Sequence, residues 1–202
     1  PLFENIPTEY LESYYPITVM EYGSLMDTGG AGFHRGGNAV HKVYRYEADG
    51  EIAIHDDRDR SEPWGIMGGL AGAKSTKELI RVDGTREFLP SKISRIPVKK
   101  GDILIYRTAG GGGWKDPFDR PSDKVQKDVR NGLVSIEKAK SDYGVILDAK
   151  TLAIDESATD KLRNDSREKR GEFDLFSIGE VPKAIGVVAT WNGNGKTDAT
   201  AA

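Results

Sequence analysis

Four consecutive glycines, Gly110, Gly111, Gly112 and Gly113, constrain the fold of this 202-residue chain more than any other feature of its sequence. Glycine loses more conformational freedom on folding than any other residue, so an ordered run of glycines is unfavourable unless the fold requires it. The requirement is either a backbone with positive φ or the close approach of another backbone, a ligand or a partner chain. We therefore expect residues 110–113 to form a structural loop, or a loop pressed against a partner subunit.

The glycine run departs from the patterns of nucleotide-binding loops. A phosphate-binding P-loop ends in Gly-Lys-Ser/Thr, and a dinucleotide-binding loop has Gly-x-Gly-x-x-Gly at the start of a helix. Here Trp114 follows the run, and Pro117 interrupts any helix that would begin close behind it. Nucleotide binding by this loop is consequently the weaker interpretation.

Short segments of alternating or β-branched apolar residues, separated by turn residues, occupy most of the chain before the glycine run. This pattern predicts a mainly β architecture, either a β-sandwich or a barrel-like sheet. A short helix is also predicted at residues 8–13. The predicted strands are residues 17–22, 39–48, 51–55, 78–82, 86–89, 91–98 and 103–106.

Beyond Pro117 the sequence pattern changes from strands to helices, with one short strand at residues 145–147. Two serines are expected to cap helices, and each predicted helix ends at a glycine, as is typical of helix termini. The caps are Ser122 and Ser135, a third helix is predicted at residues 157–169, and the terminating glycines are Gly132, Gly144 and Gly171.

These patterns predict an α+β fold in three parts. Residues 1–118 form a β-rich domain, and residues 119–180 form a C-terminal helical segment packed on it. Residues 181–202, which are rich in small and polar residues, are expected to be disordered.

The composition excludes several classes of protein. The chain has no cysteine, which excludes disulfides and thiolate metal sites. Its net charge of -3, without a basic stripe, argues against nucleic-acid binding. No apolar run approaches the roughly 20 residues that span a membrane, and no signal peptide is visible. We therefore expect a cytoplasmic protein.

Arg35 and Arg58 are the side chains that we expect to bind a substrate or another anion. A guanidinium group can bind a carboxylate or phosphate through two parallel hydrogen bonds, and the glycine run could add backbone N–H groups. The alternative for Arg35 is a structural one, in which it contacts loop carbonyls or a buried carboxylate. The sequence identifies no catalytic residue.

The stretch after His55 is acidic, but it does not fit a metal site. Asp56, Asp57 and Asp59 lack the glycine and glutamate positions of a calcium loop, and the histidines are not spaced as zinc ligands. Interleaved arginines indicate local ion pairing instead. We expect no metal in this chain.

An ordered set of motifs resembles the C-terminal part of the hydantoinase B/5-oxoprolinase family. The resemblance covers roughly residues 9 to 180, nearly the whole chain. The motifs are Tyr15-Pro16, residues 29–32 with Arg35-Gly36-Gly37, Asp59-Arg60 with residues 63–69, Gly101-Asp102, residues 110–117, residues 125–145, and Arg170-Gly171 with Phe173 and Phe176.

The resemblance implies that this chain is one part of a larger enzyme. Family subunits are much longer, and their missing part would precede Pro1 and hold the metal-binding His and Asp residues. ATP would bind to a separate, actin-like hydantoinase A-type subunit. The chain itself would then bind no cofactor, and alone it would be inactive in a hetero-oligomer that also contains the upstream hydantoinase B part.

The expected activity is ATP-dependent hydrolysis of cyclic amides such as hydantoin or 5-oxoproline. One alternative is a component of an acetone- or acetophenone-type ketone carboxylase, and the other is a non-catalytic interaction module. An enzyme part separated from its remainder is expected to expose an apolar patch, whereas a self-sufficient module is not. The sequence alone does not identify the substrate.

Overall fold

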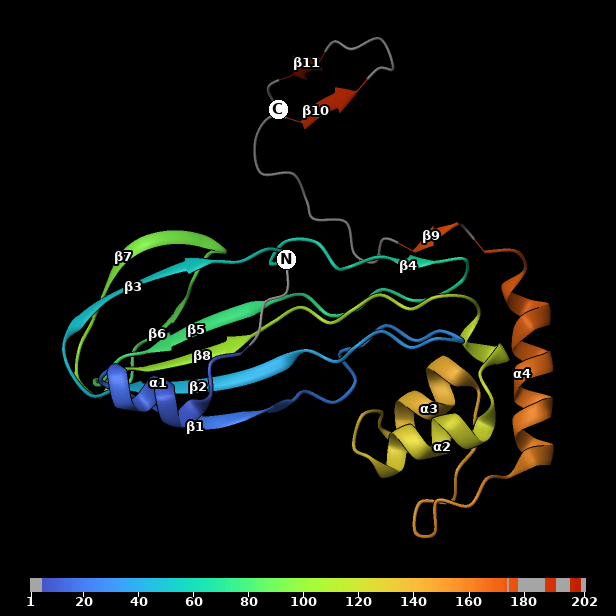
Figure 1. Ribbon diagram of the computed structural model, residues 1–202. Coiled ribbons are helices and arrows are strands. Elements are labelled where there is room, and N and C mark those ends of the chain that lie inside the picture. The colour runs from blue at the N-terminus through green and yellow to red at the C-terminus, as the bar shows by residue number, and fades with distance from the viewer. Residues whose placement is uncertain (1–4, 174, 178–187, 192–196, 201–202) are drawn as a thin grey trace.

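The computed structural model describes residues 5–173, 175–177, 188–191 and 197–200. It has a β-rich end and a helical end, and long extended segments connect them (Figure 1). In chain order the elements are α1 (Thr8–Tyr14), β1 (Ile17–Ser24), β2 (Val40–Tyr46), β3 (Gly50–His55), β4 (Gly65–Ile66), β5 (Thr76–Ile80), β6 (Arg86–Phe88), β7 (Lys92–Val98), β8 (Ile103–Arg107), η1 (Pro117–Asp119), α2 (Ser122–Arg130), α3 (Ile136–Tyr143), α4 (Glu156–Arg170), β9 (Phe176–Ser177), β10 (Val188–Trp191) and β11 (Thr197–Thr200).

The β-rich end is an antiparallel five-stranded sheet with the order β1-β2-β8-β5-β6. The ribbon formed by β3 and β7 lies against it, and the core between them contains Tyr46, Ile54, Leu79, Ile96 and Leu104. The mainly β prediction is therefore confirmed in its sandwich form. The strands that the structure describes do not close into a barrel.

The helical end has a second core, in which α2 and α3 pack through Val125, Ala139 and Tyr143. The Ser135 side chain caps α3 by accepting a hydrogen bond from the Lys138 N–H, as predicted. Ser122 does not act as a cap, because Pro121 occupies the N-cap position of α2 and Ser122 is the first helical residue. The mixed α+β fold class that the sequence predicts is confirmed.

The structure differs from the prediction at residues 145–147, and it describes only part of the tail from residue 181 onward. The strand predicted at residues 145–147 is reduced to one bridge between Leu147 and Ile154, because a tight turn held by Asp148 leaves no room for a longer pairing. Of the predicted disordered tail, residues 181–187, 192–196 and 201–202 lie outside the described residues, whereas β10 and β11 pair with each other.

Among the described residues, every helix is too short or too polar to cross a membrane.

Candidate functional site

Three extended segments, residues 28–37, 63–73 and 110–115, lie side by side and connect the two ends of the molecule (Figure 1). We call them the glycine bundle. Backbone hydrogen bonds join the central segment, residues 110–115, to both other segments. The Gly111 N–H donates to the carbonyl oxygen of Gly37 at 2.8 Å, and the Gly113 N–H donates to that of Leu70 at 2.8 Å.

Close backbone contact explains why the central segment consists of glycine. A Cβ on Gly110 would lie 1.8 Å from the Thr28 carbonyl oxygen, and one on Gly112 would lie 1.8 Å from that of Trp64. None of the four glycines has a φ in the left-handed region. Of the two reasons for a glycine run, the close approach of neighbouring backbone therefore applies here.

Hydrogen bonds within the bundle occupy backbone N–H groups of the glycine run that could otherwise bind an anion. Gly110 donates to the Ala73 carbonyl at 3.0 Å, in addition to the bonds made by Gly111 and Gly113. In this conformation the three donors face protein carbonyl oxygens. Anion binding by the glycine run stays a prediction.

Arg35 lies in a buried cluster where the bundle meets α2. Its Nη1 donates to the Gly36 carbonyl at 2.7 Å and to Asn38 Oδ1 at 2.9 Å, and its Nε is 3.6 Å from Asp128 Oδ2. Arg120 Nη2 is 2.8 Å from the same carboxylate oxygen. Two guanidinium groups thus share one carboxylate, an arrangement that matches the structural alternative for Arg35.

Arg58 has different neighbours from Arg35. Its guanidinium group lies 4.4 Å from the centre of the Trp64 ring, a cation–π contact, and Trp64 is 45% exposed. The backbone of Arg58 has φ of 66° and its carbonyl accepts a hydrogen bond from Ser75. The structure therefore places the two predicted anion-binding arginines in separate contact groups.

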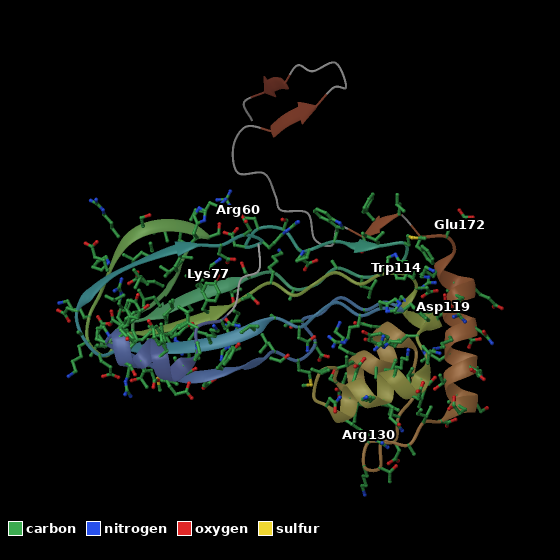
Figure 2. All side chains as sticks on the ribbon, in the orientation of Figure 1. Arg60, Lys77, Trp114, Asp119, Arg130 and Glu172 are labelled. Atoms are coloured by element: carbon green, nitrogen blue, oxygen red, sulfur yellow. The ribbon has the colours of Figure 1, made fainter. Side chains whose placement is uncertain are left out.

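Asp56, part of the acidic stretch, pairs with a lysine of the neighbouring sheet. Lys77 is 1% exposed, and its Nζ is 2.6 Å from Asp56 Oδ2 (Lys77 is labelled in Figure 2). Burial opposes ionisation of Asp56, but hydrogen bonds from Lys77 and Ser75 hold its pKa below the usual value. Asp57 likewise pairs with Lys92. The ion pairing predicted here does occur, but with lysines of other strands, which local sequence could not identify.

The outer side of the glycine bundle carries exposed apolar side chains that we call the aromatic face. Backbone contacts bring some of them together: the Met67 N–H donates to the Leu175 carbonyl at 2.7 Å, and Trp114 forms a bridge with Ile66, the neighbour of Met67. The aromatic face consists of Trp64, Met67, Leu70, Trp114, Phe173, Leu175 and Phe176. Exposed apolar side chains of this kind are typical of an interaction surface. Whether the rest of a larger subunit covers them stays a prediction.

Cationic groups lie over the rings of the aromatic face. Lys115 Nζ is 4.5 Å from the centre of the Trp114 ring, and the Arg170 guanidinium is 5.0 Å from that of Phe173. In Figure 2, Trp114 lies where the extended segments reach the C-terminal end of α4. A partner surface for this face would combine apolar and acidic groups.

Asp116 connects the end of the glycine bundle to α4. It is 6% exposed, its Oδ1 accepts hydrogen bonds from the Phe118 N–H at 2.9 Å and from Arg170 Nη1 at 3.0 Å, and its other oxygen pairs with Arg170 Nη2. Burial opposes ionisation, but these bonds and the charges of Arg170 and Arg167 hold the pKa of Asp116 below the usual value. Asp116 lies in the 110–117 motif, but its partner is 54 residues away, so no local pattern indicates this ion pair.

Comparisons with known proteins identify the family of this chain. The family model described as hydantoinase B/oxoprolinase matches residues 1–117. The beta subunit of caprolactamase from Pseudomonas jessenii is 35% identical over 159 residues, which are 75% of this chain and 26% of that subunit. The delta subunit of acetophenone carboxylase from Aromatoleum aromaticum is 27% identical, over 81% of this chain and 29% of that subunit.

A solved structure has the same fold. The crystal structure of ATP-dependent caprolactamase from Pseudomonas jessenii matches with a TM-score of 0.65 and 32% identity, over 78% of this chain and 28% of the caprolactamase chain. The chain thus spans between 26% and 29% of the length of these relatives. With the family model matching more than half of its residues, this chain belongs to the hydantoinase B/oxoprolinase family.

Proposed function

We propose that this chain works as part of a hydantoinase B-type subunit in an ATP-dependent enzyme that hydrolyses cyclic amides of the hydantoin or 5-oxoproline class. The match to caprolactamase, in sequence over 159 residues and in fold with a TM-score of 0.65, carries the proposal. Caprolactamase is by its name an enzyme for a cyclic amide and is described as ATP-dependent.

Within that enzyme, we assign this chain a supporting role and place ATP and a divalent metal on other parts. Among the described residues, no three His, Cys, Asp or Glu side chains converge to hold a metal ion. The N–H groups of Gly110, Gly111 and Gly113 donate to protein carbonyls, which supports placing ATP on another part. The remaining part of the hydantoinase B-type subunit and a hydantoinase A-type ATPase are the proposed partners.

ATP would transfer its γ-phosphoryl group to the amide oxygen and leave as ADP, which makes the ring carbon easier for water to attack. The ring C–N bond would then break with the amine as leaving group, and hydrolysis of the resulting acyl phosphate would release phosphate. This chain would contribute a wall of the site. Arg58, on the exposed Trp64 ring, could approach a negatively charged group by hydrogen bonding while it stacks. Arg35 is enclosed by Gly36, Asn38 and Asp128, so it would act by holding the bundle in shape.

The test is turnover by the assembled enzyme that contains this chain. We expect ATP-dependent ring opening of hydantoin, 5-oxoproline or caprolactam, with ADP formed in proportion to product. Arg58→Ala is expected to raise KM without changing the unfolding midpoint. Arg35→Ala is expected to lower activity, and loss of stability in the same variant assigns Arg35 a structural role.

A ketone carboxylase is the second candidate, favoured by the match to acetophenone carboxylase. Incubation of the same complex with ATP, bicarbonate and acetone or acetophenone separates the two. Carboxylated product without cyclic amide hydrolysis would replace the first proposal with the second. A chain that binds none of the enzyme's other parts is a separate interaction module, and both enzyme proposals then fail.

A further inference from the structure

The ribbon of β3 and β7 has two edges of different character. Within the described residues, β3 pairs with β7 alone, so its other edge has no strand partner. Two features interrupt β7. One is Pro97, and the other is a bulge near Arg95, where β7 has one more residue than β3 and Arg95 has a φ of 57°. Proline and bulges are features that protect an edge strand against further pairing. The sequence of β3 contains neither, so its free edge can accept another strand.

A groove follows the free edge of β3 along its whole length. It consists of two adjoining hollows of about 540 Å³ and 570 Å³, which share Tyr44, Ala53, Ile54 and Leu104 as lining residues. One hollow reaches Gly50 and the other reaches His55, the two ends of β3. We call this feature the β3 groove. It lies where β3 faces β2 and β8, beside the part of the core that the ribbon covers.

The dimensions of the β3 groove fit one more strand. The six residues of β3 span about 20 Å at about 3.3 Å per residue, so a segment of about six residues would fill the groove. Its backbone would pair with the free edge of β3, and alternate side chains would enter the groove. One end is lined by Ile17, Tyr46 and Ile52, and the other by Lys42, His55 and Tyr106. The matching segment has apolar side chains at one end and an acidic or polar side chain at the other.

The greater length of the relatives indicates which polypeptide segment could fill the β3 groove. This chain spans 26% of caprolactamase subunit beta, so about three quarters of a hydantoinase B-type subunit lies outside the matched region. We propose that an extended segment from that outside part adds as a strand to the free edge of β3 and fills the β3 groove. This proposal rests on the proposed function, because it takes the rest of the same subunit as the partner.

The geometry disfavours a second copy of the chain as the occupant. Strands of a second copy are already paired in its own sheet or ribbon, so they can meet β3 edge to edge but cannot enter the groove. An unpaired extended segment has no such restriction. Asn5 and Ile6 already line the two hollows, and Lys42 Nζ is 2.8 Å from Asn5 Oδ1. Extended polypeptide beside the groove is therefore compatible with the fold.

The experiment measures association between the full chain and the remaining part of the hydantoinase B-type subunit, produced as a separate polypeptide from the same source. Ala53 is exposed and lines both hollows, so Ala53→Asp puts a charge on β3 at the rim of the groove, where the added strand would cover it. Ser94→Asp puts the same charge on the exposed face of β7 as a matched control. Because a buried, unpaired carboxylate is unfavourable, we expect Ala53→Asp to raise the Kd at least about tenfold. Ser94→Asp is expected to change it less than about twofold.

Hydrogen exchange on the wild-type complex gives a second readout that needs no variant. We expect the backbone amides of residues 50–55 to gain protection on association. If the parts associate without protection of β3, and Ala53→Asp binds normally, the groove proposal fails while the proposed function stands. If the parts do not associate at all, both fail. Self-association of the chain that protects β3 would replace the proposed partner with a second copy.

Discussion

At the scale of single residues, glycine positions in the bundle differ sharply in the space around them. A Cβ on Gly112 would overlap the Trp64 carbonyl oxygen, whereas a Cβ on Gly37 would meet nothing within 4 Å. We predict that Gly112→Ala destabilises the fold by about 2–4 kcal/mol, because the segments must separate to admit the methyl group. Gly37→Ala, the control, is expected to change stability by less than about 0.5 kcal/mol. Urea unfolding of both variants checks this, and equal losses would contradict the close-contact explanation.

Asp116 predicts a dependence of stability on pH. Its pKa in the folded state is lowered, so its contribution is present above the unfolded pKa of about 4 and is lost as the pH falls through the folded value. We expect Asp116→Asn to be less stable than wild type near neutral pH by about 1–3 kcal/mol, since Arg170 loses its carboxylate partner.

The difference between Asp116→Asn and wild type should shrink in acid. Free energies of unfolding measured from about pH 7 down to about pH 3 check it. Asp165→Asn, on the exposed side of α4, is the control and should follow the wild-type curve. A constant difference across the pH range would mean that Asp116 acts through its shape and not through its charge.

At the scale of elements, α4 is attached to the rest of the helical end through its first turns. Thr159 is fully buried, and its hydroxyl oxygen accepts a hydrogen bond from the Ile146 N–H at 3.0 Å. We predict that Thr159→Val, which keeps the shape but removes the acceptor, destabilises the protein by about 1–3 kcal/mol. Thr159→Ser keeps the acceptor and should lose about 1 kcal/mol for the missing methyl group. Thermal unfolding compares them; a serine variant less stable than the valine variant would assign Thr159 a packing role alone.

Local patterns predicted most elements, and the reasons differ between strands and helices. The alternation of apolar residues located β1 and β3 to within a few residues, although β1 has no fully buried residue and β3 buries only Ile54. Helix α3 begins after a capping serine and ends at Gly144 with φ of 63°. The β4–β9 pair was not predicted, since two-residue strands have no periodicity and form only where distant segments meet.

At the scale of the whole molecule, the glycine bundle joins the two ends into one unit. Side chains tie the bundle to the helical end: Asn38 Nδ2 donates to the Leu133 carbonyl at 2.9 Å, and Arg120 Nη1 donates to the Phe33 carbonyl at 2.8 Å. We predict a single cooperative unfolding transition, because neither end keeps its contacts when the bundle opens. Tryptophan fluorescence and circular dichroism should give coincident curves. Separate transitions would show that the helical end folds independently.

The sequence by itself determined the fold class, the positions of most elements, and the family, because these depend on local periodicity, capping residues and ordered motifs. It also marked the glycine run as a place that requires either a positive φ or the close approach of another group. Only the tertiary structure decided what approaches it, since Gly37, Trp64 and Leu70 are far from the run in sequence. The same holds for the partners of Arg35 and Asp116, and for the β3 groove. These depend on which segments meet in space, and a single sequence carries no local signal of such meetings.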